Sequence, residues 1–513
     1  MGDLSAENWE KLTFPNQIRK WVKKYSGRIA IKEGNKSITY FELEKSIAIV
    51  QKSFLENGVA KGDKIAIYLA NSSEFIIILL ALLSIGAVPI LFLENQGKNE
   101  VESIIEFSKP KMFIYNEKKQ VDIGRLKTNL IELQYMSTKK ITNTIENIDK
   151  IINDQEYSAI YSDDVKQSDL AVLLLSGGTT GIPKLIPRTH GDYIYNISKI
   201  NERLNIEEND IYLSILPMAH NFGLGNPGIL GTMMSGGKVV ICNEVAAMEI
   251  FSLIEKEKAT FTSLVPSILK VCLEYRKIDE TDDISSLKMI LVGGAPLKRS
   301  IAEEVDILLK SKLIQVYGIA EGLICTNYLN DSLNTRVSCQ GRPISEYDLI
   351  KIVNLNGDEV SEGESGELIT KGPYTIHEYY ELVDSYKYFN NEGYYCTGDE
   401  AVKLSDGSIK IVGRIREQIN RSGEKIIPSE LECVINEYYK VKDCVVIGTD
   451  DEFLGNRISV YAMSNEKFDI NELNNFLRRK GIAEYKLPDT LKIVKDFPYT
   501  PVGKIDKKSL LQG

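Results

Sequence analysis

Hydrophobic and polar residues are grouped along this chain in blocks that favour parallel strands separated by helices. Residues 64–69 (KIAIYL) and 170–175 (LAVLLL) are short continuous apolar runs, which are typical of strands buried on both faces. Residues 238–242, 259–264 and 289–292 also have the pattern of strands. Because helix-like segments lie between these runs, the pattern predicts a large α/β domain with mixed, largely parallel sheets and flanking helices.

The longest apolar stretch, residues 75–93, is close to the roughly 20 residues that cross a bilayer. Gly86 and Pro89 interrupt it, and Ser72 and Ser73 just before it offer the start of a helix. We therefore expect a buried helix that ends at Gly86 and a buried strand after it, with no membrane association.

The last hundred or so residues follow a different pattern. A helix is predicted from Pro428, with Ser429 as its cap and Glu432 three residues later as the second half of a capping box. Short strands are predicted over residues 444–447 and 458–463. This combination is typical of a small α+β unit.

Composition narrows the class of protein. A chain of 513 residues is long enough for two or more domains, and its net charge of −10 argues against general nucleic-acid binding. It has 7 cysteines without a Cys-x-x-Cys pair and only 3 histidines, which favours neither a zinc site nor a disulfide framework. Reduced thiols and the absence of a signal peptide pattern lead us to expect a cytoplasmic protein.

A loop rich in glycine and hydroxyl residues follows the strand at residues 170–175. Its sequence, LSGGTTGIPK over residues 175–184, places small residues where backbone N–H groups can surround an anion, and it ends in a lysine. Its spacing differs from the P-loop of kinases and GTPases. The loop therefore predicts a polyphosphate site, and the residues expected to form it are Ser176, Gly177, Gly178, Thr179, Thr180, Gly181 and Lys184.

With its continuation LIPRTH, the segment 176–190 resembles the signature of acyl-adenylating enzymes, a superfamily of acyl-CoA ligases, luciferases and adenylation domains of nonribosomal peptide synthesis. The form SGG followed by PRTH is most similar to the stand-alone aryl-acid adenylating enzymes of siderophore pathways, such as 2,3-dihydroxybenzoate-AMP ligases. The resemblance covers essentially the whole chain, from residues 37–43 (SITYFEL) onward. It implies an N-terminal domain over residues 1–415 that binds ATP and the acid, and a small mobile C-terminal domain over residues 416–513.

Further segments match the nucleotide motifs of these enzymes. In residues 315–322 (QVYGIAEG), the resemblance implies that Tyr317 packs on adenine and that Glu321 binds Mg²⁺, for which hard oxygen ligands are suited. Residues 395–399 (YCTGD) match a ribose motif in which Asp399 accepts hydrogen bonds from the ribose hydroxyls. The residues that the resemblance assigns to ATP or AMP outside the loop are Gly293, Gly294, Ala295, Gln315, Val316, Tyr317, Gly318, Asp399, Ile411 and Arg414.

The C-terminal domain is implied to carry the catalytic lysine. Residues 500–506 (TPVGKID) match the family's last motif, in which Lys504 would neutralise the carboxylate and the α-phosphate. Arg416 stands at the position of the family's hinge. Rotation there would replace Lys504 by a face with Gly423 and Lys425 beside the tunnel for the thiol.

The acid pocket is expected to begin in residues 216–227 (LPMAHNFGLGNP). There His220 resembles the family's gating residue, which approaches the carboxylate and the phosphate. Amino-acid-activating relatives have an aspartate where Asn221 stands, whereas aryl-acid relatives have asparagine and use it on an ortho hydroxyl. A neutral amide does not pair with an ammonium group, so Asn221 favours an aryl acid.

Two neighbours depart from the 2,3-dihydroxybenzoate pattern. Phe222 lacks the hydroxyl of the usual tyrosine, and Asn226 is larger than the usual serine and adds a donor and an acceptor. Salicylate or another hydroxy- or amino-substituted aryl acid is therefore an expected substrate beside the catechol acid. Gly294 and Leu323 complete the predicted pocket.

Two alternatives stay open. The first is an acyl- or aryl-CoA ligase, because the residues around Lys425 do not separate free CoA from the phosphopantetheine thiol of a carrier protein acting in trans. The second is a non-catalytic nucleotide-binding relative. The joint presence of charged residues at all the motif positions argues against this second alternative; they are Lys184, Glu321, Asp399, Arg414 and Lys504.

Overall fold

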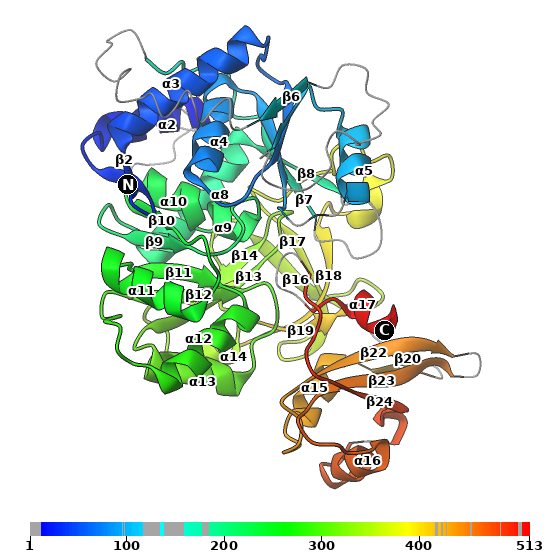
Figure 1. Cartoon of the computed structure of the whole chain (residues 1–513). Helices are drawn as coiled ribbons and strands as arrows, with labels where there is room; N and C mark the ends of the chain where they lie inside the picture. The colour runs from blue at the N-terminus through cyan, green and yellow to red at the C-terminus, as the bar shows by residue number, and fades with distance from the viewer. Residues whose placement is uncertain are drawn as a thin grey trace.

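The structure is a computed structural model that describes residues 12–94, 96, 98–115, 134–137, 158–176, 184–415, 419–421, 424–426, 428–451, 454–482, 484–500 and 505–512. Figure 1 shows a large body of sheets and helices, with a small lobe of orange and red elements at its lower edge. In the part of the chain that the structure describes, every helix is too short or too polar to cross a bilayer.

A nine-stranded sheet forms one half of the large body, in the order β15-β14-β13-β12-β11-β9-β10-β1-β2. The strands from β13 to β1 are parallel, and antiparallel strands flank them at both ends. The three predicted runs after residue 237 are strands of this sheet, which confirms them. The strands are β1 Ile29–Glu33, β2 Lys36–Thr39, β9 Ile211–Ser214, β10 Lys238–Ile241, β11 Phe261–Leu264, β12 Met289–Gly293, β13 Lys312–Gly318, β14 Ile324–Thr326 and β15 Arg342–Pro343.

A second, six-stranded sheet has the order β6-β5-β3-β4-β7-β8 and is parallel except for the β7–β8 hairpin. The two predicted buried strands before residue 180 belong to it. Its strands are β3 Lys64–Tyr68, β4 Val88–Phe92, β5 Met112–Tyr115, β6 Gln134–Ser137, β7 Leu170–Leu175 and β8 Leu185–Thr189.

The long apolar stretch forms the buried helix α4, Ser73–Ile85, and the strand β4, as predicted. Ser72 caps the helix by accepting a hydrogen bond from the Phe75 N–H. Gly86 ends it with φ of 73°, and a Cβ there would lie 2.5 Å from Val165 Cγ2, so only glycine fits.

The other helices of the large body cover the sheets and connect their strands. They are α2 Phe14–Lys24, α3 Tyr40–Glu56, α5 Lys98–Ser108, α8 His190–Leu204, α9 Asn221–Gly225, α10 Gly228–Met234, α11 Ala247–Glu257, α12 Pro266–Ile278, α13 Arg299–Leu308 and α14 Leu333–Ser338, with the 3₁₀ turn η2 Ser385–Tyr388. The largest apolar cluster combines side chains of both large sheets with those of α2, α3, α4 and α8. Helix α8 is therefore held firmly in the interior, which matters for the site below.

A four-stranded antiparallel sheet packs against the end of the nine-stranded sheet. An apolar cluster that includes Cys325 of β14 and Leu368 and Ala401 of the small sheet joins the two. This contact brings the last strands of the large body beside the end of β13. The strands are β16 Leu349–Val353, β17 Ser365–Lys371, β18 Tyr395–Lys403 and β19 Ile409–Arg414.

The small lobe is the α+β unit that the sequence predicts, with its own apolar core. Its sheet runs β21-β20-β23-β22, with β24 paired to β23. The elements are β20 Ile419–Arg421, β21 Glu424–Ile426, α15 Pro428–Ile435, β22 Asp443–Asp451, β23 Gly455–Met463, α16 Ile470–Arg479, η4 Glu484–Lys486, β24 Thr490–Val494 and α17 Lys507–Gln512.

Ser429 is not the cap of this helix as predicted, because α15 begins at Pro428 and Ser429 is its second residue. The Ser429 hydroxyl donates to the Val412 carbonyl on β19 at 2.5 Å, and Glu432 Oε1 accepts from the Val446 N–H at 2.8 Å. Both side chains are used in contacts with neighbouring elements, because a donor or acceptor near a helix end can be satisfied by any close partner. The Ser429 bond is one of the contacts between the small lobe and the large body.

Candidate active site

The parallel strands β12 and β13 end side by side at the centre of the candidate site. Gly293 pairs with Val316 in the register of the sheet. A Cβ at Gly293 would lie 2.6 Å from the Val316 carbonyl oxygen and 3.3 Å from Phe222 Cε1. Gly294 follows with φ of 86°, and it and Ala295 are exposed. The turn therefore leaves a bare edge for a flat ring, and Phe222 of the predicted acid pocket lies against it.

Three residues predicted for the nucleotide form one hydrogen-bonded group. Asp399 Oδ1 accepts from Arg414 Nε at 2.7 Å, and Asp399 Oδ2 accepts from the Tyr317 hydroxyl at 2.7 Å. The Asp399 side chain is 4% exposed, whereas that of Arg414 is 52% exposed. Burial and the Asp399 charge raise the pKa of Tyr317, so its hydroxyl stays protonated and donates. Residues of β13, β18 and β19 thus hold the Asp399 carboxylate in a fixed orientation, with the Arg414 guanidinium on its solvent side.

A cluster of tyrosines joins the predicted metal ligand to the predicted phosphate lysine. The Tyr379 hydroxyl donates to Glu321 Oε1 at 2.7 Å and lies 2.8 Å from the Tyr395 hydroxyl. Lys184 Nζ lies 4.3 Å from the ring centre of Tyr379 and 3.7 Å from that of Tyr388, within the range of cation–π attraction. Burial and the Glu321 charge raise the pKa of both Tyr379 and Tyr395, which keeps their hydroxyls protonated. Glu321 and Lys184 therefore face the same aromatic cluster.

The side chain of Gln315 is used inside the protein. Its Nε2 donates to the Arg336 carbonyl and its Oε1 accepts from Gln340 Nε2, both at 2.9 Å. Gln340 Oε1 accepts in turn from the Ile411 N–H at 2.8 Å. Gln315 and Ile411, both predicted at the nucleotide, are thus connected through Gln340, and this relay ties β13 to β19 beside Asp399.

The glycine-rich loop is closed at its base. The Ser176 N–H donates to the Lys184 carbonyl, and the Lys184 N–H donates to Ser176 Oγ, both at 2.9 Å. These bonds extend the β7–β8 hairpin by one pair. The middle of the loop, residues 177–183, lies outside the described residues; the predicted members there are Gly177, Gly178, Thr179, Thr180 and Gly181.

The predicted acid residue Asn221 is held by helix α8. The Tyr193 hydroxyl donates to Asn221 Oδ1 at 2.8 Å. Asn226 Nδ2 donates to the Asn221 carbonyl at 3.1 Å, and Asn226 Oδ1 accepts from Asn196 Nδ2 at 2.7 Å. Each end of the Asn226 amide therefore makes a hydrogen bond inside the protein, and the place of Asn226 in the acid pocket stays a prediction.

His220 precedes Asn221 as the cap of α9. Its Nδ1 accepts from the Phe222 N–H at 3.2 Å, so the hydrogen of the neutral ring is carried by Nε2. The side chain is half-buried at the end of the short helix. The three consecutive residues 220–222 thus reach the pocket from one fixed turn.

Arg188 connects the acid side of the site with the metal side. Its guanidinium is fully buried, forms an ion pair with Asp192 at 2.8 Å and donates through Nη1 to the Ala320 carbonyl at 3.0 Å. It also lies over the Tyr193 ring at 5.0 Å. Since Ala320 immediately precedes Glu321, this one side chain contacts both the turn with the predicted metal ligand and the helix that holds Asn221.

Comparison with protein families decides the identity of this fold and site. The model described as AMP-binding enzyme matches residues 18–380, and the model described as AMP-binding enzyme C-terminal domain matches residues 430–504.

The chain belongs to the AMP-binding enzyme family.

Relatives extend along the full length of this AMP-binding enzyme. A 2,3-dihydroxybenzoate-AMP ligase of Bacillus subtilis is 36% identical over 98% of the chain and 94% of its own length. A 2-hydroxy-7-methoxy-5-methyl-1-naphthoate–CoA ligase of Streptomyces carzinostaticus is 31% identical over 99% of the chain and 94% of its own. Among solved structures, apo MbtA of Mycobacterium smegmatis has a TM-score of 0.74 at 30% identity, covering 99% and 96% of the two chains. These matches confirm the resemblance and the fold expected from the sequence.

The residues of this AMP-binding enzyme fit a nucleotide with Mg²⁺. Among the described residues, no cluster of three or more His, Cys, Asp or Glu side chains is placed to hold a metal. Magnesium commonly uses one or two carboxylates together with phosphate oxygens and water. Glu321, oriented by Tyr379 on Oε1, is suited to that mode of binding.

Leu323 lies elsewhere than predicted. It is fully buried and packs with Cys325, Leu368 and Ala401 under the four-stranded sheet. Ile319 and Ala320 of the same turn pack against the large core that contains Phe222. The prediction that Leu323 lines the ring pocket is corrected, because the turn after β13 directs Leu323 to the opposite side.

Several predicted residues fall outside the described part of the chain. They are the catalytic Lys504, the hinge residue Arg416 and the tunnel residue Gly423, while for Lys425 only the backbone in β21 is described. The flanks of the lysine segment are in place, since Tyr499 and Ile505 form an antiparallel bridge.

Sequence reasoning missed the tyrosines that orient the site. Tyr379 lies 58 residues after Glu321, and Tyr193 lies 28 residues before Asn221. No local spacing rule connects such partners, and a tyrosine in an apolar segment is usually a core residue. A signal was available for Tyr193, because it lies in the helix that directly follows the run PRTH with Arg188.

Proposed function

We propose that this chain is an acid-AMP ligase that joins an aryl carboxylic acid to AMP and then transfers the acyl group to the phosphopantetheine thiol of a carrier protein. The observation that carries this proposal is the close contact between the predicted acid pocket and the glycine turn. Phe222 Cε1 lies 3.3 Å from the position that a Cβ would take at Gly293. A carboxylate beside Asn221 and a nucleotide on the glycine turn would be neighbours, as an in-line reaction at the α-phosphate requires.

In the first half-reaction, a carboxylate oxygen of the acid attacks the α-phosphorus of ATP. The bond between that phosphorus and the bridging oxygen breaks, and pyrophosphate leaves with the electron pair. Asp399 and Arg414 would orient the ribose, while Lys184 and Lys504 would stabilise the negative charge on the phosphates and the carboxylate. Mg²⁺ held at Glu321 would neutralise phosphate charge when bound.

In the second half-reaction, the thiol sulfur attacks the carbonyl carbon of the acyl-adenylate, the thiol proton is released and AMP leaves. We place the domain boundary between residues 415 and 416, with Arg416 as the hinge of the mobile C-terminal domain. Its rotation would remove Lys504 and present Gly423 and Lys425 to the thiol. Since ATP and reduced carrier thiols are cytoplasmic, we expect the reaction there.

The pocket supports an acid with a hydroxyl next to its carboxyl. Asn221 is neutral and almost buried, so an ammonium or a second carboxylate would be unpaired beside it. Both relatives named above act, by their names, on aromatic acids with a hydroxyl at the neighbouring carbon. Salicylate and 2,3-dihydroxybenzoate are therefore the first substrates to test.

A second candidate acceptor is free CoA. The relative from Streptomyces carzinostaticus is a CoA ligase at 31% identity, and the first half-reaction is the same in both cases. Incubating the enzyme with acid and ATP, and then with CoA or with a phosphopantetheinylated aryl carrier protein, separates the two by the thioester formed. Thioester on CoA alone would favour the second candidate.

The proposal is tested by acid-dependent exchange of labelled pyrophosphate into ATP. We expect exchange with 2-hydroxybenzoate and 2,3-dihydroxybenzoate, weaker exchange with benzoate, and none with amino acids. If neither aromatic nor aliphatic acids support exchange, the assignment as an acid-AMP ligase is wrong. Exchange confined to aliphatic acids would retain the ligase and overturn the aryl pocket.

A further inference from the structure

Helix α8 presents two side chains, Tyr193 and Asn196, to the segment that carries Asn221. They are three residues apart and so lie on one face of the helix. Both are fully buried. Tyr193 holds the side chain of Asn221, and Asn196 holds its backbone indirectly through Asn226. Asn221 is therefore immobilised at both its amide and its carbonyl before any acid enters.

The bond from Tyr193 decides which end of the Asn221 amide is available. An amide oxygen can only accept, and Oδ1 accepts from the Tyr193 hydroxyl at 2.8 Å. Burial raises the pKa of Tyr193, so the phenol remains a donor across the physiological range. The Asn221 NH₂ group has no hydrogen-bond partner among the described residues, and Asn221 retains 9% exposure. What the pocket offers at this point is a donor.

The surroundings prevent Tyr193 from turning away. A Cβ at Gly225 would lie 2.7 Å from the Tyr193 hydroxyl oxygen, so glycine is needed there to make room for it. The Phe14 ring meets the Tyr193 ring edge-on at 6.2 Å, and the Arg188 guanidinium covers it at 5.0 Å. The hydroxyl therefore has one stable direction, toward Asn221.

We propose that Tyr193 is a positioning residue that sets acid specificity by turning the Asn221 amide so that its NH₂ group faces the substrate. The acid must then present a hydrogen-bond acceptor next to its carboxyl. A hydroxyl oxygen meets this requirement, because its own hydrogen can bond to the neighbouring carboxylate. An aromatic amine does not, since its nitrogen lone pair is delocalised into the ring. This inference rests on the proposed function and gives its preference for an ortho hydroxyl a structural cause, which excludes the amino-substituted aryl acids that the sequence left open.

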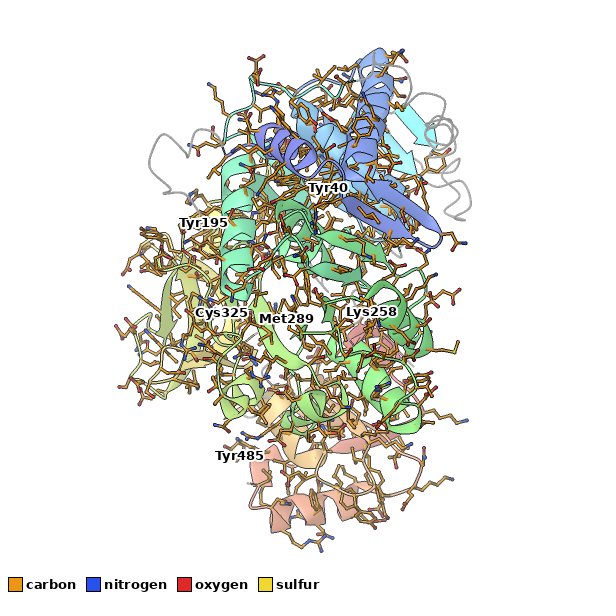
Figure 2. The ribbon with its side chains drawn as sticks, turned by 90° about the vertical axis from the view of Figure 1, so that its left-hand side faces the viewer. Tyr40, Tyr195, Lys258, Met289, Cys325 and Tyr485 are labelled. Carbon is orange, nitrogen blue, oxygen red and sulfur yellow. The ribbon has the colours of Figure 1, made fainter. Side chains whose placement is uncertain are left out.

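The test compares two conservative variants of the same helix, Tyr193→Phe and Tyr195→Phe. Tyr195, labelled on α8 in Figure 2, is also buried, but its hydroxyl pairs with Ser345 Oγ at 2.7 Å. Each variant removes one buried hydroxyl and keeps the ring. Pyrophosphate exchange is measured with 2-hydroxybenzoate and with benzoate, and the ratio of the two kcat/KM values is the readout.

In Tyr193→Phe we expect this ratio to fall about 10-fold, the equivalent of one hydrogen bond, with the KM for ATP unchanged. In Tyr195→Phe the ratio should stay at the wild-type value. A ratio unchanged in Tyr193→Phe, or lowered equally in both variants, would overturn the inference, since the effect would then be absent or due to general loosening of the helix.

The wild-type enzyme provides a second test that does not depend on folding of a variant. Exchange with 2-aminobenzoate should be at least about 10-fold weaker in kcat/KM than with 2-hydroxybenzoate, because the amine cannot accept from Asn221. Equal or better use of 2-aminobenzoate would overturn the inference while leaving the ligase intact. Failure of every acid to support exchange would instead overturn the proposed function, so the two failures are distinguishable.

Discussion

The two sides of the site are built from different chemistry. The acid side, on α8 and α9, consists of buried neutral groups that hydrogen-bond to one another, with Tyr193, Asn221 and Asn226 as its centre. The nucleotide side consists of charged groups at the ends of β13, β18 and β19 and at the base of the glycine-rich loop, where Arg414 is half exposed. The acid side is buried, whereas the nucleotide side combines the buried Asp399 with the half-exposed Arg414.

This difference indicates a division of labour. A buried neutral pocket discriminates between acids, because a substrate that leaves a buried donor unpaired loses binding energy. Charged groups oriented toward the phosphates stabilise the developing charge and should affect all acids equally. We therefore expect changes on the nucleotide side to alter the rate and changes on the acid side to alter the choice of substrate.

The largest effect is expected for Lys504→Ala on the nucleotide side. Loss of the cation should lower adenylate formation about 100- to 1,000-fold for every acid, comparable to removing a donor from an oxyanion site. Transfer from preformed acyl-adenylate to the thiol should change far less. Single-turnover assays of each half-reaction check this, with the exposed Lys508→Ala as a matched control. Equal loss in both half-reactions would contradict the assigned role.

Asn221→Asp should have the next largest effect and should change which acids the enzyme accepts. The substitution replaces the NH₂ donor by a carboxylate in an almost buried position, so kcat/KM for 2-hydroxybenzoate should fall about 100-fold. The KM for ATP should be unaffected. Asn205→Asp, the same change at the exposed end of α8, is the control and should leave exchange unchanged. Undiminished turnover of neutral aryl acids by Asn221→Asp would remove this residue from the pocket.

Tyr379→Phe tests the link between the tyrosine cluster and the metal. Removing the hydroxyl that orients Glu321 should raise the Mg²⁺ concentration for half-maximal exchange roughly 10-fold, since partners of metal-binding carboxylates commonly contribute that much. The acid preference should remain. Tyr388→Phe retains the ring beside Lys184 and serves as the control. A change in acid preference in Tyr379→Phe would contradict the hypothesis that only the acid side determines substrate preference.

The smallest effect expected is on stability, at the start of α8. In the folded protein burial lowers the pKa of His190 to about 4, partly opposed by Asp169, whereas an unfolded histidine titrates near 6.5. The unfolded chain therefore binds the proton first, and the stability that the neutral ring contributes is present above about pH 6.5 and lost as pH falls toward 4. Urea unfolding should give a free energy about 1 kcal/mol lower at about pH 5.5 than at about pH 7.5.

The control for this measurement is His190→Asn, whose side-chain oxygen can still accept from the Phe14 N–H but does not titrate in this range. The histidine contribution is the difference between the two pH dependences. A variant with the same pH dependence as the wild type would show that His190 is not the group that titrates.

Several buried strands, the buried helix α4 and the small α+β lobe could be predicted from the sequence, because each depends on apolar periodicity and on local start and stop signals. The sequence also singles out Glu321, Asp399 and Arg414, since each stands in a short recognisable segment, and the structure pairs Asp399 with Arg414. The cap at Ser429 was predicted wrongly, because a local pattern does not show that β19 offers a closer partner.

The sequence by itself determined the family and the chemistry to expect: a loop predicted for phosphates, a carboxylate for the metal, a carboxylate for ribose and a neutral amide for the acid. Only the tertiary structure decided the orientation and the hydrogen-bond partners of those groups. Leu323 packs under the four-stranded sheet, and Asn226 accepts a hydrogen bond from Asn196. The hydroxyl of Tyr193 donates to Asn221, and that of Tyr379 donates to Glu321. The physical reason is that a hydrogen bond depends on distance and direction in space, which packing of elements remote in the chain creates.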